Sequence, residues 1–200
     1  MLHRALIALP ILCAPTLAVA EPVPEAPAPA LRMSLDVDPM VYAAYGGWGF
    51  YAGIRPAATG QWRFRVGAHA ATLPSVAVET NDNNKGWDEH IDIALTAAVD
   101  RNFGQGRGGW FAGGVTGFSN LTFTAPGGGD VDLQAAVVGV EGGYRWFPFK
   151  RLGLTVTPHL AALFPLYTSN DATVGTMTYD QFPVIPIAQV WIGYEPGILK

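Results

Sequence analysis

Apolar and polar residues alternate along most of this chain, and residues 61–73 show the pattern most clearly. Trp62 and Phe64 fall on one side of this stretch, while Arg63 and Arg65 fall on the other. Successive side chains of a β-strand point to opposite faces, so the stretch predicts a strand with one apolar and one strongly polar face. The chain is therefore predicted to consist of two-faced β-strands.

The same alternation predicts seven further strands, separated by turns rich in Gly, Pro, Asn and Asp. Phe118 interrupts the phase of the fifth strand, which favours a β-bulge there. The connections after the first and fifth strands are expected to be short. The eight expected strands cover residues 33–42, 48–55, 61–73, 89–103, 110–124, 132–147, 154 up to the polar segment at 168–181, and 184–195.

The first 20 residues have the pattern of a secretory signal peptide. A short basic start is followed by an apolar run over residues 5–17 and by Ala-Val-Ala at 18–20, a small-x-small cleavage site. The mature chain is then expected to begin at Glu21 and to lack cysteine, because Cys13 is the only one in the sequence. A buried N-terminal helix is the alternative reading of this segment.

Residues 21–32 are predicted to be a Pro/Ala-rich lead-in rather than part of a sheet. Four prolines within residues 21–30 favour an extended, semi-rigid segment. A plain linker is the expected role, and a motif that binds the cell wall or a partner is the alternative. The remaining residues, 33–200, are long enough for one β-domain.

Composition narrows the class of protein. The net charge of -4 gives no electrostatic reason to expect a nucleic-acid partner. Charged residues make up 14% of the chain, against roughly 25% in ordinary soluble domains. Glycine is abundant, with 24 residues, and aromatic residues reach 12%. This mixture is typical of a membrane β-barrel, whose outer face carries no charge, and it suits a secreted β-sandwich less well.

The polar faces of the predicted strands differ from an ordinary soluble surface. Lysine is confined to Lys85, Lys150 and Lys200, in loops or at the end of the chain. Small residues share the polar faces with isolated charges, as expected where large side chains must fit inside a narrow barrel. The small residues are Gly49, Gly53, Gly67, Gly139 and Gly143.

Aromatic residues gather near the ends of the strands, beside the short turns. Such belts are typical of the membrane–water boundary, although they also suit the core of a sandwich or a lipocalin-like soluble barrel. The aromatic residues concerned are Trp62, Phe103, Trp110, Phe111, Tyr144, Trp146, Phe147, Phe149 and Tyr194. The apolar faces are therefore predicted to face lipid, with a soluble ligand-binding β-barrel as the alternative.

Residues 142–149, Gly-Gly-Tyr-Arg-Trp-Phe-Pro-Phe, resemble the strand ends of small eight-stranded outer-membrane β-barrels. The signal peptide, the alternation and the order of short and long connections add to this resemblance. It implies an all-β, eight-stranded antiparallel up-and-down transmembrane β-barrel in the outer membrane. It further implies lipid and the outer-membrane insertion machinery as partners, and a monomer. One departure is that Tyr194, an aromatic end to the last strand, is followed by residues 195–200.

Inside such a barrel, the polar faces place ionic groups that must be paired, because an unpaired charge is costly at low dielectric. Arg63 and Arg65 are expected near Asp100, and Glu141 near His159. A salt-bridge network that plugs the barrel and a narrow polar pore are the two readings. The predicted interior network comprises Arg55, Arg63, Arg65, His69, Asp92, Asp100, Glu141, Arg145 and His159.

The sequence gives little sign of catalysis. His69, His90 and His159 have no metal-ligand spacing, and no serine is clearly placed beside a histidine. No metal, cofactor or catalytic residue is therefore predicted. The expected function is a structural or narrow-pore outer-membrane barrel, and a lipid-modifying hydrolase of the outer membrane is an alternative.

Overall fold

The structure, a computed structural model, describes residues 31–56, 60–79, 81–104 and 108–196. The signal peptide predicted at residues 1–20 and most of the lead-in predicted at 21–32 lie outside these ranges. The first strand begins at Leu31, two residues before the expected start of the barrel domain.

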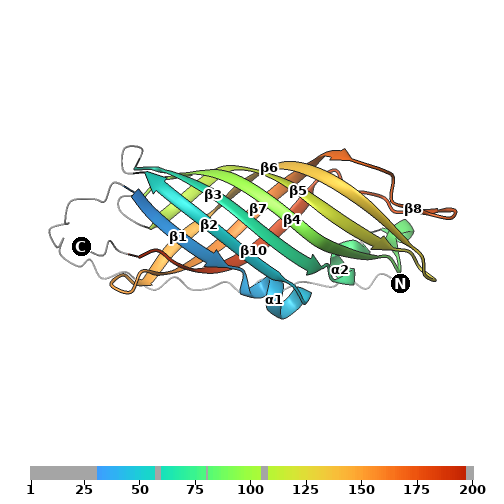
Figure 1. Ribbon diagram of the computed structural model, residues 1–200, viewed down its shortest axis with the longest axis horizontal. Helices are drawn as coiled ribbons and strands as arrows, with labels where there is room; N and C mark the ends of the chain where they lie inside the picture. Colours follow the sequence, from blue (N-terminus) through green and yellow to red (C-terminus); the bar gives the residue numbers. More distant parts are fainter. Residues whose placement is uncertain (1–30, 57–59, 80, 105–107, 197–200) are drawn as a thin grey trace, which may run out of the picture.

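Eight strands close into one antiparallel barrel, as the alternation predicted (Figure 1). Each strand pairs with its neighbour in the sequence, and the last pairs with the first, so the barrel is an up-and-down one. A small hairpin, β8 (Thr173–Val174) and β9 (Met177–Thr178), lies outside the ring. The ring strands are β1 (Leu31–Val37), β2 (Trp48–Pro56), β3 (Trp62–Thr72), β4 (Asp88–Asn102), β5 (Gly109–Thr124), β6 (Asp130–Phe149), β7 (Leu154–Thr168) and β10 (Ile185–Tyr194).

The two ends of the barrel differ. The short connections after β2, β4 and β6 lie at one end, here called the turn end, where β1 also begins and β10 finishes. The opposite end, here called the mouth, carries the connections after β1, β3, β5 and β7. Two of these are long: one holds α2 (Ser75–Val78) and the 3-10 helix η2 (Asp82–Asn84), and the other holds the β8–β9 hairpin.

The first strand is shorter than predicted, because residues 39–45 form the helix α1 (Pro39–Tyr45) instead of continuing it. Asp38 caps the helix, and its carboxylate accepts hydrogen bonds from the N–H groups of Met40 (3.0 Å) and Val41 (3.3 Å). Pro39 occupies the first turn, where its missing N–H costs nothing. Gly46, with φ of 60°, ends the helix in the left-handed conformation. The short loop expected after the first strand is thus a helical connection.

Among the described residues, none of the helices has both the length and the apolar character that crossing a membrane requires.

The predicted bulge at Phe118 is absent from the pairing of β5 with β6, which runs without a shift from Gly109 to Thr124. Phe118 simply faces outward, as Trp110 does. Register shifts occur elsewhere in the ring: β3 shifts between His69 and Ala71, and β4 shifts between Ile91 and Ile93. The pairing of β6 with β7 shifts twice, between Ala136 and Val137 and between Trp146 and Phe149. The shifts in β3 and β4 reverse which residues of these two strands face inward near the mouth.

The polarity of the barrel is inverted over most of its height. Outward side chains at mid-height are apolar and exposed, such as Val66 at 61% and Val140 at 60%. Inward side chains at the same level are ionic and buried, such as Arg65 at 5% and Glu141 at 7% exposed. This is the arrangement that lipid outside a polar lumen favours.

Most of the aromatic residues predicted at the turn end do face outward there, including Trp62, Trp110 and Trp146. Phe111 and Phe147 are exceptions, since both are buried inside the barrel. They fall on the inward phase of β5 and β6, which puts them among the lumen side chains rather than in an outer belt.

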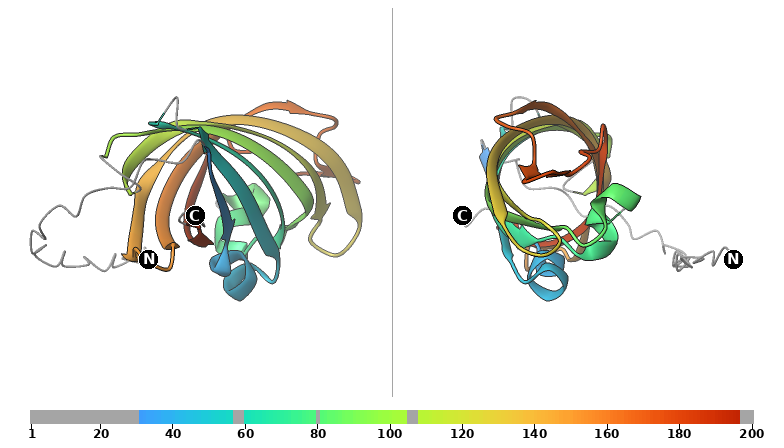
Figure 2. Two further views of the ribbon diagram at one scale, coloured as in Figure 1. Left: turned by 60° about the vertical axis from the view of Figure 1, so that its left-hand side comes forward. Right: turned by 90° about the vertical axis from the view of Figure 1, so that its right-hand side faces the viewer.

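At the mouth the polarity returns to that of a soluble protein. Trp87, Phe123 and Leu133 are buried together with Tyr179 in an apolar core. The strands around this core expose acidic side chains, of which Asp132 is an example. The two long connections fold over the same end of the ring, as the end-on view shows (Figure 2). An apolar plug therefore closes the mouth above the ionic lumen.

Candidate functional site

Small inward residues make room for the large polar side chains of the lumen. A Cβ at Gly67 would overlap the ring of Tyr51 on the neighbouring strand β2. A Cβ at Gly193 would overlap the carboxylate of Asp36. At Gly53 the Oγ of Ser34 would be only 2.7 Å from a Cβ. The mixture of glycine and ionic residues on the predicted inner faces is therefore a packing requirement.

The centre of the lumen holds a chain of four titratable side chains. Arg65 of β3 donates from Nε to Asp100 of β4 at 2.8 Å, and its Nη2 pairs with Glu141 of β6. The other oxygen of Glu141 lies 2.8 Å from Nε2 of His159 on β7. All four side chains are buried, so the chain crosses the lumen from β3 to β7 without exposing a charge.

Trp191 of β10 completes this central cluster from the remaining side of the barrel. The guanidinium of Arg65 lies over the indole, with 4.3 Å between its carbon and the ring centroid. The imidazole of His159 stacks on the same indole at 4.3 Å, and Tyr51 contacts it at 5.0 Å between centroids. Trp191 lies on the inward face of β10, and the sequence did not identify it as the partner of Arg65 and His159.

A second ionic cluster fills the lumen nearer the turn end. Arg63 pairs with Asp36 and donates to the Oγ of Ser34 at 2.8 Å. Arg145 lies 3.5 Å from both Asp36 and Glu195. Asp36 is therefore the hub that joins β1 to β3 and β6, a role that strand-by-strand reasoning had not assigned.

The structure brings seven of the predicted interior residues together as buried side chains: Arg55, Arg63, Arg65, Asp100, Glu141, Arg145 and His159. His69 is partly buried near the mouth. Asp92 does not join them, because it lies within the register shift of β4 and is exposed. Its carboxylate accepts a hydrogen bond from Thr122 at 3.0 Å, away from the lumen network.

The lumen offers little for chemistry. The His159–Glu141 pair resembles part of a catalytic relay, but both side chains are sealed within the barrel. Within the described ranges, no three His, Cys, Asp or Glu residues are grouped to hold a metal ion.

The mouth is locked by a contact between its two long connections. The buried side-chain amide of Asn84 donates to the carbonyl of Asp180 at 3.0 Å and accepts from the N–H of Asp180 at 2.8 Å. Tyr179 packs beside Phe123 at 4.7 Å between ring centroids, and burial raises the pKa of its hydroxyl above the ordinary value. These contacts hold the plug in place.

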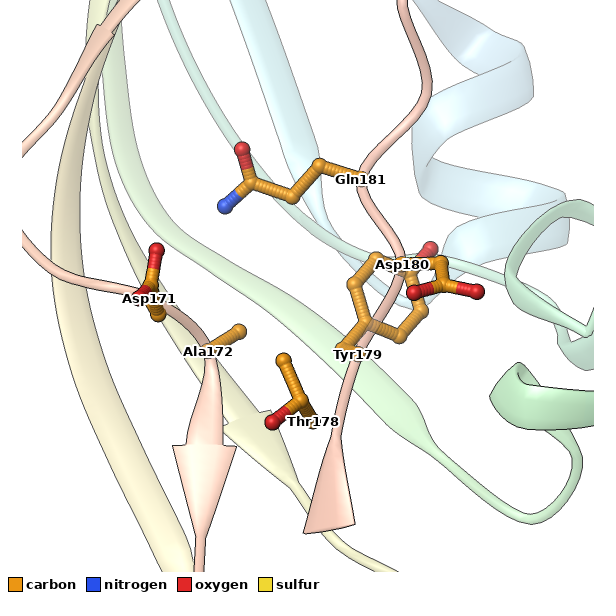
Figure 3. A pocket seen from close by; sticks show the side chains of 6 residues that line it. All are labelled: Asp171, Ala172, Thr178, Tyr179, Asp180 and Gln181. Carbon is orange, nitrogen blue, oxygen red and sulfur yellow. The ribbon is translucent and has the colours of Figure 1, made fainter.

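Two shallow pockets lie at the mouth. The first, of about 340 Å³, lies beside the hairpin and is lined by Asp171, Ala172, Thr178, Tyr179, Asp180 and Gln181 (Figure 3). The second, of about 390 Å³, lies at β4, β5, β6 and the start of the connection after β7, and is lined by Asp92, Asn120, Leu121, Asp132, Leu133, Gln134 and Ser169. Neither opens into the ionic clusters of the lumen, since no member of those clusters lines them.

Comparison with known proteins finds similarity in the fold. No protein-family model matches the sequence, and no curated protein matches it at a significant level. The chain has the fold of a small eight-stranded β-barrel.

Three solved structures illustrate this similarity. Neisserial surface protein A (NspA) is 12% identical, with a TM-score of 0.48 over 84% of this chain and 96% of its own. A major outer membrane protein from Thermus thermophilus is 14% identical, with a TM-score of 0.41 over 82% and 98%. The N-terminal β-barrel domain of Pseudomonas aeruginosa OprF is 10% identical, with a TM-score of 0.39 over 82% and 96%. Identities this low transfer no function, so function is inferred from the barrel's own residues.

Proposed function

We propose that this protein is an outer-membrane β-barrel of structural type, with a lumen closed by paired charges and a mouth closed by its own loops. The observation that carries the proposal is the inverted polarity of the wall. Apolar side chains such as Val66, Leu95 and Leu160 are exposed on the outside, while the arginines and carboxylates are buried on the inside. Exposure of these apolar side chains to water would be unfavourable, whereas contact with acyl chains would be favourable.

Export and insertion follow from the same proposal. Residues 1–20 would act as a signal peptide. The lead-in predicted at residues 21–32, shortened by the start of β1 at Leu31, would lie on the periplasmic side. Insertion would use the outer-membrane insertion machinery, with Tyr194 as the aromatic end of the last strand. The protein would work as a monomer, because the ring closes on itself and leaves lipid as its main neighbour.

A soluble ligand-binding barrel is the poorer explanation. Such a barrel would line its lumen mainly with apolar side chains, whereas here the apolar core lies at the mouth and ionic side chains fill much of the lumen below it. Around Arg65 and Glu141 the lumen is filled by ion pairs and by the ring of Trp191. An apolar ligand would have to displace these partners and leave buried charges behind.

A narrow pore is the second candidate function. The ion pairs and the Trp191 ring that fill the lumen argue against it. The central cluster crosses the lumen from β3 to β7, and the plug at the mouth adds a second barrier. We therefore expect the native protein to show no steady conductance in a planar bilayer. Stable channels that charge reversal at Arg65 abolishes would favour the pore instead.

Location and fold can be tested together on the full chain expressed in a Gram-negative host. The mature protein is expected in the outer-membrane fraction, and to migrate differently on a detergent gel before and after boiling, as a detergent-resistant barrel does. Recovery from the periplasm as a detergent-free monomer would refute the proposal. Unchanged lipid A in a strain lacking the gene would exclude the alternative of a lipid-modifying hydrolase.

A further inference from the structure

The barrel wall is interrupted in its mouth-side half. Among the described residues, β1 and β10 form three residue pairs, the last joining Val37 to Ile192. β10 continues from Trp191 to Ile185 and is paired there with β7 alone. The helix α1 takes the place of a strand beside this part of β10, and also contacts β2 and β3 (Figure 2). One short helix therefore closes this section of the wall.

The composition of α1 suits a position in contact with the membrane. It contains no charged residue, it buries Val41, and it exposes Tyr42 at 77%. Its backbone is bonded to its own flanks, for example from the N–H of Gly47 to the carbonyl of Val41. Within the described part of the chain, no backbone hydrogen bond joins α1 to β10. Side-chain packing alone holds the two together, so this contact opens more easily than a strand pair.

A cluster of polar side chains lies directly inside this section of the wall. An added Cβ at Gly49 would be 3.2 Å from the Cβ of Asp38, 3.5 Å from that of His69 and 3.6 Å from the ring of Tyr51. Asp38 and His69 therefore flank Gly49. The ring of Tyr51 lies between this pair and Trp191, with 5.0 Å between the ring centroids of Tyr51 and Trp191. The cluster extends from the start of α1 to the inner face of β10.

Three polar atoms of this cluster are buried without a hydrogen-bond partner among the described residues. They are Oδ2 of Asp38, Nδ1 of His69 and Nε1 of Trp191. Asp38 and Trp191 are each only 2% exposed. Buried polar atoms are nearly always partnered in native proteins, so these three atoms lack the partner that their burial calls for.

Two of these atoms, on Trp191 and Asp38, decide the chemistry of the group that would pair with them. The indole N–H of Trp191 donates, and the carboxylate oxygen of Asp38 accepts. A hydroxyl does both, because it accepts from the indole and donates to the carboxylate. A carboxylate or phosphate has no proton to give and would face the charge of Asp38. An uncharged head group bearing hydroxyls is therefore the complement.

We propose that α1 covers a lateral binding site for a single-chain amphiphile with an uncharged, hydroxyl-bearing head group. The head group hydrogen-bonds Trp191 and Asp38, and the acyl chain passes between α1 and β10 to the outer leaflet. The outward residues Ala188 and Val190 of β10 offer the chain an apolar surface. The proposal rests on the outer-membrane location proposed above, since lipid supplies the ligand.

The test uses the mature chain in phosphatidylcholine nanodiscs, titrated with a monoacylglycerol. The readout is the indole N–H resonance of Trp191, assigned by its loss in Trp191→Phe. A saturable change in chemical shift is expected, and the methyl ester of the same fatty acid, which lacks hydroxyls, is expected to give none. A lysophospholipid with an anionic head group is expected to bind at least tenfold more weakly.

Two variants and one matched control test whether binding occurs at this site. Gly49→Ala adds a methyl group beside Asp38 and His69, and is expected to abolish the saturable shift. Asp38→Asn keeps the helix cap and is expected to weaken binding about tenfold, as loss of a hydrogen bond to a charged group does. Gly114→Ala faces outward, with its nearest neighbour 3.8 Å away, and is expected to leave binding unchanged.

The result can contradict the site without contradicting the location. A dispersed β-barrel spectrum with no saturable shift, or with equal shifts from the methyl ester, would overturn the site alone. Equal binding by all three variants would do the same. Failure of the native chain to give a β-barrel spectrum in lipid would instead refute the proposed membrane location.

The route of entry has its own readout in the same sample. A monoacylglycerol with a nitroxide at the end of its chain is expected to broaden the amide signals of Ala43 and Ala188, on either side of the gap. Broadening of Tyr179 in the plug, with Ala43 and Ala188 unaffected, would show entry through the mouth and overturn the lateral route.

Discussion

At the scale of single residues, the lumen depends on side chains that are buried with their partners. Arg65 contacts Asp100, Glu141 and the ring of Trp191, so three elements of the wall depend on one guanidinium. The sequence allowed the pairing of Arg65 with Asp100 to be expected, because β3 and β4 are consecutive. The pairing of Asp36 with Arg63 could not be expected, since β2 separates β1 from β3 in the ring.

Arg65→Gln is expected to lower the free energy of unfolding by about 3–5 kcal/mol, because it leaves two buried carboxylates without their cation. Unfolding by guanidinium in lipid vesicles measures this change. Arg101→Gln is the matched control, since Arg101 lies on β4 but is exposed. Similar small effects of both substitutions would show that the lumen is solvated rather than sealed.

Gly67→Ala tests whether the inner faces are packed to their limit. The new methyl group would overlap the ring of Tyr51, so a loss of about 1–3 kcal/mol is expected in the same assay. Shortening the ring by Tyr51→Leu in the Gly67→Ala background is expected to recover part of it. A neutral Gly67→Ala would mean that Tyr51 has room to move.

At the scale of the elements, the strands were predictable and the helix α1 was not. The strand ranges follow from the alternation of apolar and polar residues, and a long strand repeats this alternation many times. Met40, Val41 and Tyr42 suit a strand by composition, so the pattern seemed to continue past Asp38. The signals against it were local: a capping Asp38, Pro39 after it, and Gly46 seven residues later.

Asp38→Ala is expected to loosen α1, because it removes the acceptor for two N–H groups at the start of the helix. Loss of such a cap costs about 1 kcal/mol. Hydrogen exchange at Met40 and Val41 measures the effect, and faster exchange is expected there than in the native protein. Asp38→Asn retains an acceptor and serves as the control, and equal acceleration in both variants would contradict a capping role.

At the scale of the whole molecule, the barrel has apolar side chains outside and ionic side chains inside for most of its height. At the mouth it has an apolar core and a polar surface, as soluble proteins do. The sequence predicted the inverted part, because its alternation is unbroken from Trp62 to Val66 and in the neighbouring strands. The mouth was not predictable in this way. Register shifts at His69–Ala71 and Ile91–Ile93 exchange the two faces, and a pattern read strand by strand does not locate them.

The plug also joins segments that are far apart in the sequence. Asn84 and Asp180 come from different connections, and only the closed ring brings them into contact. Asn84→Ala is expected to free both connections while leaving the barrel intact. Limited proteolysis of the folded protein should then cut within residues 73–87 or 169–184, where the native protein resists. Resistance equal to that of the native protein would show that the apolar core holds the mouth without the Asn84 contact.

The central claim is that the apolar wall faces lipid, and spin-label accessibility in bilayers tests it most directly. Single cysteines at Val66, Val140 and Leu160 would carry a nitroxide, with Gln134, exposed above the apolar band, as the aqueous reference. The first three labels are predicted to be accessible to oxygen and shielded from a water-soluble nickel chelate, and the label at Gln134 to show the reverse. Access of the chelate to the labels at Val66, Val140 and Leu160 would contradict a lipid-facing wall.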